Sequence, residues 1–191
     1  MLFSLRKVVV MSNIEKLACR FAVLAVICVL AFLSRAATYC DWKGVDGGDF
    51  WDSKNWVNGI VPNTSDRVAR FNVANAVPGT VVITNSPEVS FGYIYCSSGG
   101  WRLKLVGTHC FGGDYDNGGL RVTGVGTSVT IEGGTITNTC FVSENGGQLV
   151  FDNCVTRSCL THRRLNSSLS DPDAYVFNGG KHDFRTMYMR L

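Results

Sequence analysis

The chain has 191 residues, a formal net charge of +3 and eight cysteines. Hydrophobic residues make up 46% of it and charged residues 17%, a composition typical of a folded globular protein rather than a disordered one. Much of the positive charge lies in residues 1–36: removing five of the 18 basic residues and one of the 15 acidic residues with that segment leaves 13 and 14. The nearly neutral remainder argues against nucleic-acid binding, which requires a positive surface.

Residues 1–36 have the pattern of a secretory signal peptide. Four basic residues precede residues 21–33, an apolar run without charge, and Ser34 and Ala36 then supply the small residues of a cleavage site. This run is short for a membrane span, although an uncleaved anchor is the alternative. We therefore expect export to the cell surface or medium, with cleavage near Ala36 and no membrane span after cleavage.

Residues 118–156 contain short runs in which apolar and polar side chains alternate, separated by Asn, Gly or Gly-Gly. Such alternation, rich in Val, Ile and Thr, predicts half-buried strands, and the glycines predict tight turns between them. No amphipathic helix pattern follows residue 37. The chain is therefore predicted to be all-β.

A weak internal repeat runs through the same region. Residues 128–137 align with residues 148–157 at a spacing of 20, and residues 130–135 align with residues 176–181 at a spacing of 46. The first alignment puts Val129 on Leu149, Ile131 on Phe151 and Thr137 on Arg157. A period near 20 is typical of a right-handed parallel β-helix, or β-solenoid, and a β-sandwich with similarly spaced strands is the alternative.

The organisation expected after the signal has two parts. Residues 37–79 are rich in Trp and Gly and are predicted to form an N-terminal cap, because an open solenoid end exposes strand edges and apolar core. Residues 80–191 are predicted to form the coils. We expect the series of coils to be truncated at Leu191, because no capping pattern precedes it.

The cap segment resembles a known family. Its order of residues is similar to that at the start of bacterial exported surface proteins of the autotransporter-associated β-strand and PEP-CTERM types, and the matching positions are Trp42, Trp51, Asn55, Trp56, Gly59, Pro62, Asp66, Ala69 and Phe71. The resemblance covers residues 38–71 and implies a parallel β-helical surface or passenger protein without one particular activity. The chain departs from that pattern by lacking a C-terminal sorting helix, which leaves its mode of attachment open.

Trp42, Trp51 and Trp56 have two interpretations. They cover the apolar end of the solenoid as cap and core residues, or they form an exposed platform on which sugar rings stack. The second interpretation predicts a glycan-binding module.

Six cysteines remain after the signal: Cys40, Cys96, Cys110, Cys140, Cys154 and Cys159. An exported protein can form disulfides, and the 20-residue period places Cys140 and Cys159 almost above one another in adjacent coils. We therefore predict a disulfide between these two. Buried free thiols are the alternative, because cysteine packs well as a small apolar residue.

Evidence for a metal site is weak. Asp114 and Asp116 match the first positions of a calcium loop, but Val125 stands where that loop needs a glutamate. Cys154, Cys159 and His162 lack the spacing of a zinc site. We expect neither a metal nor a cofactor.

Catalysis by a β-helical polysaccharide lyase or glycosidase requires acidic residues on neighbouring coils together with a basic residue. Two groups of residues could supply this chemistry: Asp152 with Arg157, and Asp171 and Asp173 with Arg163 and Arg164. Neither group shows the two-carboxylate geometry of a glycosidase in the sequence alone.

The sequence therefore favours a non-enzymatic, exported β-solenoid with a structural or adhesive role on a surface. Its expected partner is a cell-surface polysaccharide or another surface protein. A secreted glycan-binding module and a carbohydrate-active β-helix enzyme are the two alternatives.

Overall fold

The computed structural model of the chain describes residues 38–84, 93–112, 119–164 and 175–190, and the side chains within these ranges other than 162–164 and 186–190. All of them belong to one unit, Ala37–Leu191. The predicted signal segment, residues 1–36, lies outside the described residues, so its targeting role stays a prediction.

Strands account for most of the described residues. The strands are β1 (Thr38–Asp41), β2 (Gly48–Asp49), β3 (Arg67–Phe71), β4 (Thr80–Ile83), β5 (Tyr93–Cys96), β6 (Gly100–Leu105), β7 (Thr108–His109), β8 (Leu120–Thr123), β9 (Ser128–Glu132), β10 (Thr135–Thr137), β11 (Cys140–Glu144), β12 (Gln148–Asp152), β13 (Val155–Arg164), β14 (Tyr175–Asn178) and β15 (Lys181–Arg190). Two single-turn 3-10 helices, η1 (Ser53–Asn55) and η2 (Val57–Gly59), lie between β2 and β3. No helix in the described part of the chain has the length and apolar character that crossing a membrane requires.

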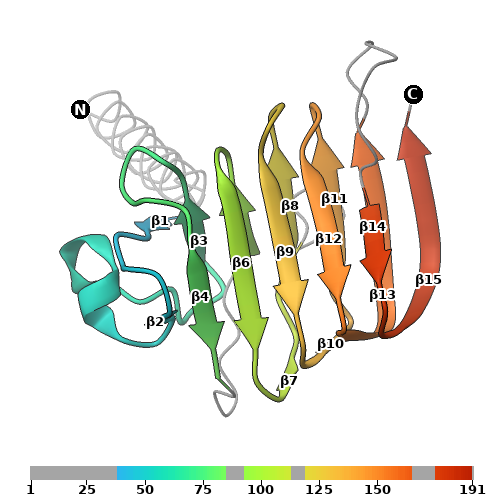
Figure 1. Cartoon of the computed structure of the whole chain (residues 1–191), viewed down its shortest axis with the longest axis horizontal. Coiled ribbons are helices and arrows are strands. Elements are labelled where there is room, and N and C mark those ends of the chain that lie inside the picture. The colour runs from blue at the N-terminus through green and yellow to red at the C-terminus, as the bar shows by residue number, and fades with distance from the viewer. Residues whose placement is uncertain (1–37, 85–92, 113–118, 165–174, 191) are drawn as a thin grey trace, which may run out of the picture. The chain divides into compact units, whose positions relative to one another are not determined.

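Neighbouring strands in the two sheets come from successive coils and pair in parallel. The first sheet runs β1-β3-β5-β8-β11-β13-β10-β7, with β15 also paired to β13. The second sheet runs β2-β4-β6-β9-β12-β14. Figure 1 shows β4, β6, β9, β12 and β14 side by side in that order. This is a parallel β-solenoid of about five turns. It confirms the predicted β-helix and excludes the β-sandwich, whose sheets are antiparallel.

The 20-residue repeat predicted from the sequence equals the spacing between paired residues on neighbouring strands. Leu149 pairs with Val129, Phe151 with Ile131, and Arg157 with Thr137, as the 20-residue spacing requires. Val150 pairs with both Thr130 and Val176, which places residues 46 positions apart two coils apart. The repeat could be found in the sequence because each position keeps its face from one coil to the next.

Tight corners separate the straight segments of a coil. Positive φ angles occur at the non-glycine residues Asn138 (48°), Asn145 (52°), Asn153 (50°) and Ser158 (54°). They also occur at glycine pairs such as 133–134. Asparagine tolerates this left-handed conformation better than most residues because its short polar side chain bonds locally. The corner at Ser158 divides β13, so that its first part pairs with β10 and its last part with β11.

Alternation along the strands fills the interior with apolar side chains. From the second sheet come Val81, Ile83, Leu103, Leu105, Val129, Ile131, Leu149 and Phe151, and from the first come Ile94, Leu120, Val122 and Phe141. The Phe141 and Phe151 rings meet edge to face across the interior, with centroids 4.9 Å apart. Each such side chain contributes roughly 1.5–3 kcal/mol by leaving water, so the stacked coils hold one another together.

The segment predicted as a cap also starts the ladder. Strand β1 pairs with β3, and β2 pairs with β4, so residues 38–71 already contribute strands to both sheets. Between them, Trp42 and Trp56 form an isolated antiparallel bridge. The cap and the first coil are therefore one continuous structure.

Glycine at position 134 is required by a close approach between coils. Its φ is +62°, and a Cβ atom there would lie 2.6 Å from the Leu105 Cβ of the preceding coil. Gly126 has a similar φ of +78° but faces open space. We expect Gly126→Ala to lower the free energy of unfolding by about 1–2 kcal/mol through backbone strain alone. Gly134→Ala should cost about 1–3 kcal/mol more, because the coils must separate.

Urea denaturation of both purified variants checks this expectation. Equal losses of stability for the two alanines would contradict the close packing of coils at Gly134.

Candidate functional site

The outer face of the first sheet gathers aromatic and charged side chains from five neighbouring strands, β1, β3, β5, β8 and β11. We call it the tyrosine–arginine face, and its members are Tyr39, Asp41, Arg70, Tyr93, Tyr95, Arg121 and Glu144. Strand alternation directs these side chains outward, as Tyr93 and Tyr95 flank the buried Ile94 and Arg121 lies between the buried Leu120 and Val122. The ladder register then aligns Asp41, Arg70, Tyr95 and Arg121 in one row across β1, β3, β5 and β8.

Arg70 and Asp41 form a two-pronged ion pair at the start of this row. The Arg70 Nε donates to Asp41 Oδ1 at 2.5 Å, and its Nη2 donates to Oδ2 at 2.7 Å. This hydrogen bonding raises the pKa of the Arg70 guanidinium further above its ordinary value. Paired, charge-assisted bonds of this kind fix the plane of the guanidinium as well as its position.

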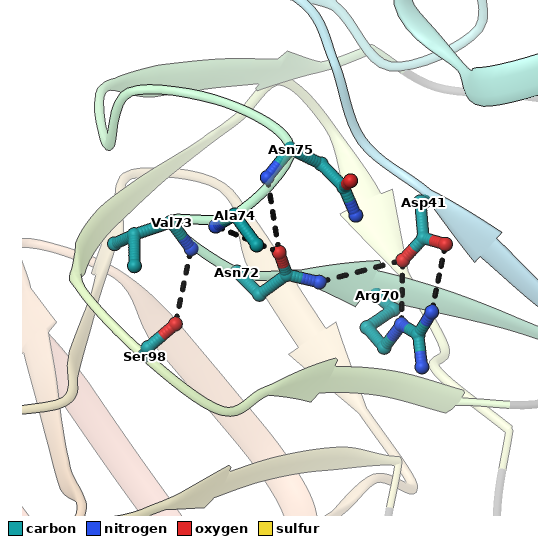
Figure 2. A network of polar contacts seen from close by, with 7 residues as sticks. All are labelled: Asp41, Arg70, Asn72, Val73, Ala74, Asn75 and Ser98. Carbon is teal, nitrogen blue, oxygen red and sulfur yellow. Dashed lines mark hydrogen bonds and ion pairs between the residues drawn. The ribbon is translucent and has the colours of Figure 1, made fainter.

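Asn72 connects this ion pair to the turn that follows β3. Its Nδ2 donates to Asp41 Oδ1 at 3.4 Å, while its Oδ1 accepts from the backbone nitrogens of Ala74 and Asn75 at 3.0 and 3.1 Å. Figure 2 shows this network, in which Asn72 stands between the carboxylate and the turn. The position of Asp41 is therefore held from two sides.

Arg121 and Glu144 form a second ion pair farther along the face. Both the Nε and the Nη2 of Arg121 donate to Glu144 Oε1, at 2.9 and 2.5 Å. Glu144 is buried. A buried carboxylate needs such a partner, because removing it from water without one is costly.

Each arginine also lies over a tyrosine ring. The Arg70 Cζ is 4.6 Å from the centre of the Tyr39 ring, and the Arg121 Cζ is 5.9 Å from the centre of the Tyr95 ring. The two rings are 6.2 Å apart and tilted by 50°. The face thus repeats one unit twice, a carboxylate, an arginine and a tyrosine in contact, with cation–π attraction joining the last two.

The third tyrosine stays protonated to high pH. Burial, and after it a hydrogen bond with Tyr39, raises the pKa of Tyr93 to about 12. Burial also raises the pKa of Tyr95. The Tyr93 and Tyr95 phenols are therefore neutral hydrogen-bonding groups at physiological pH.

A second charged cluster lies on the outer side of the other sheet. The Arg102 Nη1 is 2.7 Å from Glu132 Oε2 and 3.5 Å from Asp152 Oδ2, and these two acids are register partners on β9 and β12. The sequence predicted Asp152 together with Arg157. The structure instead brings Asp152 to Arg102, two coils earlier, and to Glu132, which sequence reasoning missed because only the register reveals their proximity.

The three tryptophans are not equivalent. Trp42 and Trp56 are 1% and 0% exposed, with ring centroids 5.1 Å apart in an edge-to-face contact, and the Trp56 Nε1 donates to the Phe50 carbonyl at 2.7 Å. They are core residues, so the interpretation as an exposed glycan platform is wrong for both. Trp51 is partly buried against the core, and its Nε1 donates to the Thr84 carbonyl.

The predicted Cys140–Cys159 disulfide does not form. All six cysteines of the described residues are free thiols, and five of them are buried. The ladder pairs Cys140 with Leu160, while Cys159 follows the corner at Ser158 and pairs with Phe184. A period of 20 therefore leaves the two cysteines one position out of register. Burial raises the pKa of Cys154 to about 11, which favours the unreactive thiol.

Other predicted residues lie outside the described part of the chain. These are the calcium candidates Asp114 and Asp116, the acids Asp171 and Asp173, and the side chains of His162, Arg163 and Arg164. Within the described residues, no group of three or more His, Cys, Asp or Glu side chains is placed to hold a metal ion.

Comparisons of the chain with models of protein families, with curated proteins and with solved structures find no match in any of the three. The resemblance to exported surface proteins therefore remains an expectation drawn from the residues of the cap segment.

Replacing Trp56 tests its assignment to the core. We expect Trp56→Ala to lower the free energy of unfolding by about 3–5 kcal/mol, because it leaves a large cavity among packed aromatic rings. Trp51→Ala should cost less, since Trp51 is only partly buried. Urea denaturation of both variants measures the difference. A small effect of Trp56→Ala would contradict its place in the core.

Alkaline pH tests the environment of Tyr93. Its pKa of about 12 in the folded protein exceeds the value of ~10 in an unfolded chain, so the folded state holds this proton more tightly. The stabilisation is complete below pH ~10 and is lost as the pH rises through about 12. Urea denaturation across this range should show a steeper loss for the wild type than for Tyr93→Phe. Identical slopes would contradict the raised pKa.

Proposed function

We propose that this protein is a non-enzymatic, exported β-solenoid with a structural and adhesive role, and that its tyrosine–arginine face binds a cell-surface polysaccharide. Export rests on the signal pattern of residues 1–36 and on the resemblance of the cap segment to surface proteins. Adhesion rests on the face itself. The observation that carries the proposal is that Arg70 and Arg121, which share one register row, each contact a carboxylate and a tyrosine ring.

The chemistry of the face suits a sugar polymer. A tyrosine ring offers an apolar body to the C–H groups of a sugar and a hydroxyl to its oxygens. The Tyr39 side chain is accessible, since this residue is 45% exposed. Arginine and carboxylate groups beside it supply donors and acceptors for sugar hydroxyls.

The scaffold also favours binding of an extended partner. The side chains of the face are placed by backbone ladders and ion pairs rather than by mobile loops. Little conformational entropy is then lost when a polymer binds, which raises affinity for the same contacts.

A carbohydrate-active β-helix enzyme is the second candidate. The observation that favours it is the pair of carboxylates, Glu132 and Asp152, on neighbouring coils beside Arg102. We place it second because both acids engage the same guanidinium on a partly exposed strand surface, where little desolvation is available to tune an acid–base pair. Release of reducing ends or unsaturated products from a polysaccharide, abolished by Glu132→Gln, would favour this candidate.

Binding to insoluble polysaccharides tests the adhesive function. The purified protein is mixed with cellulose, chitin, xylan and cross-linked pectin, and the bound fraction is measured at increasing concentrations. We expect binding to at least one polymer, and about a tenfold weaker affinity for Tyr39→Ala, equivalent to ~1.4 kcal/mol of lost contact.

Arg102→Gln is the matched control, because it removes an ion-paired arginine from the opposite sheet. Its binding should equal that of the wild type. Loss of binding in Arg102→Gln with none in Tyr39→Ala would place the binding surface elsewhere. Circular dichroism of each variant shows whether the fold is retained.

A further inference from the structure

The structure points to the class of polysaccharide. We infer that the tyrosine–arginine face selects an uncharged glycan and holds it across the strands, along the solenoid axis. This inference rests on the proposed function, because it concerns the ligand of the same face.

The first argument is the balance of charge on the face. Arg70 is neutralised by Asp41, and Arg121 is neutralised by Glu144. An acidic glycan would have to approach these carboxylates or displace them from their arginines. Either event costs free energy, since breaking such a pair leaves a partly buried charge without a partner.

The second argument is the hydrogen-bonding capacity that remains. Within the described part of the chain, the Nη1 atoms of Arg70 and Arg121 take part in neither ion pair, which use Nε and Nη2. A sugar hydroxyl can accept from such a nitrogen and donate to a carboxylate oxygen at the same time. A neutral hydroxyl therefore matches both members of the Asp41–Arg70 pair, which a single charge cannot do.

The third argument is direction. Arg70 lies on β3 and Arg121 on β8, with β5 between them. The two units therefore repeat along the solenoid axis at two strand spacings, or ~9.5 Å. An extended glycan with alternating sugar orientation also presents the same edge at every second ring. A polymer along the axis would pass both arginines, whereas one parallel to the strands would meet only one of them.

The opposing possibility is a site for an acidic glycan farther along the same sheet. Arg164 of β13 is the register partner of Glu144, and Arg190 of β15 is the register partner of Arg164. A site that included them would carry excess positive charge and would favour an acidic glycan. Our inference places the site on β1 to β11, where the charges cancel, and the test separates the two cases.

Affinity electrophoresis in native gels tests the inference. The gels contain a neutral polymer, hydroxyethyl cellulose or galactomannan, or an acidic one, polygalacturonate or alginate. We expect retardation by a neutral polymer, an affinity that changes less than about twofold between low and high salt, and at least tenfold weaker affinity for the acidic polymers. Oligosaccharides of the neutral polymer should gain affinity up to roughly four sugar units, the span of the four strand spacings from β1 to β11.

Asp41→Asn tests the role of the ion pair directly. It leaves Arg70 without its carboxylate, and we expect affinity for polygalacturonate to rise at least tenfold while affinity for the neutral polymer falls. Glu144→Gln is the second variant, should Asp41→Asn fail to fold, with the same expectation at Arg121. Glu132→Gln is the matched control, because it removes a carboxylate from the Arg102 ion pair on the other sheet and should leave affinity for both kinds of polymer unchanged.

The outcomes separate the two proposals. Retention by acidic polymers alone, weakened by salt, overturns the inference about ligand class while the adhesive function stands. Affinity that is already maximal for a disaccharide overturns the direction along the axis. No retention by any polymer in gels or on insoluble polysaccharides overturns the adhesive function itself, and the inference with it.

Discussion

The structure depends on the parallel backbone ladder between successive coils. Each strand gives its hydrogen bonds to the coil before it and the coil after it, so a residue and its register partner share the same face. This constraint stacks Val129, Ile131 and their partners into the interior. It also lines up Asp41, Arg70, Tyr95 and Arg121 on the surface. Core and candidate site are thus products of one geometric rule.

The outer faces of the two sheets carry different side chains. On the first sheet, charged groups lie beside aromatic rings, and the arginines are held by both. On the second sheet, Arg102 bridges two acids, and no aromatic contact of its guanidinium occurs among the described residues. Both faces are close to electrical balance, but in the described part of the chain the first alone offers apolar ring surface beside its polar groups. That difference is why we assign binding of a sugar polymer to the first sheet.

The sequence predicts the fold well where local and long-range signals agree. The alternation around Ile131 and Phe151, together with a constant coil length of 20 between them, was enough to predict their pairing. Coil length varies elsewhere: Thr80 pairs with Arg102, and Gly100 with Ser128, at spacings of 22 and 28. Register there could not be derived from a fixed period, so the row from Asp41 to Arg121 was not foreseen.

The wrong site predictions have a related cause. Of the two interpretations of the tryptophans, the core interpretation is confirmed for Trp42 and Trp56, and the glycan platform is wrong for both because their rings fill the interior. The disulfide was expected from a 20-residue spacing, whereas Cys159 lies 19 residues after Cys140, behind a left-handed corner at Ser158. One residue of offset decides whether two thiols face one another, and sequence periodicity does not resolve that offset.

The buried thiols have a consequence for how the protein comes apart. A solenoid coil contacts only its neighbours, so opening can spread inward from an end. Within the described residues, Phe177 of the last coil is 40% exposed, whereas Trp42 and Trp56 are buried and close the first coil. Cys154 and Cys159 are close to the last coil, and Cys40 and Cys96 are near the closed end. The order in which these cysteines react with a thiol reagent therefore shows which end of the solenoid unfolds first.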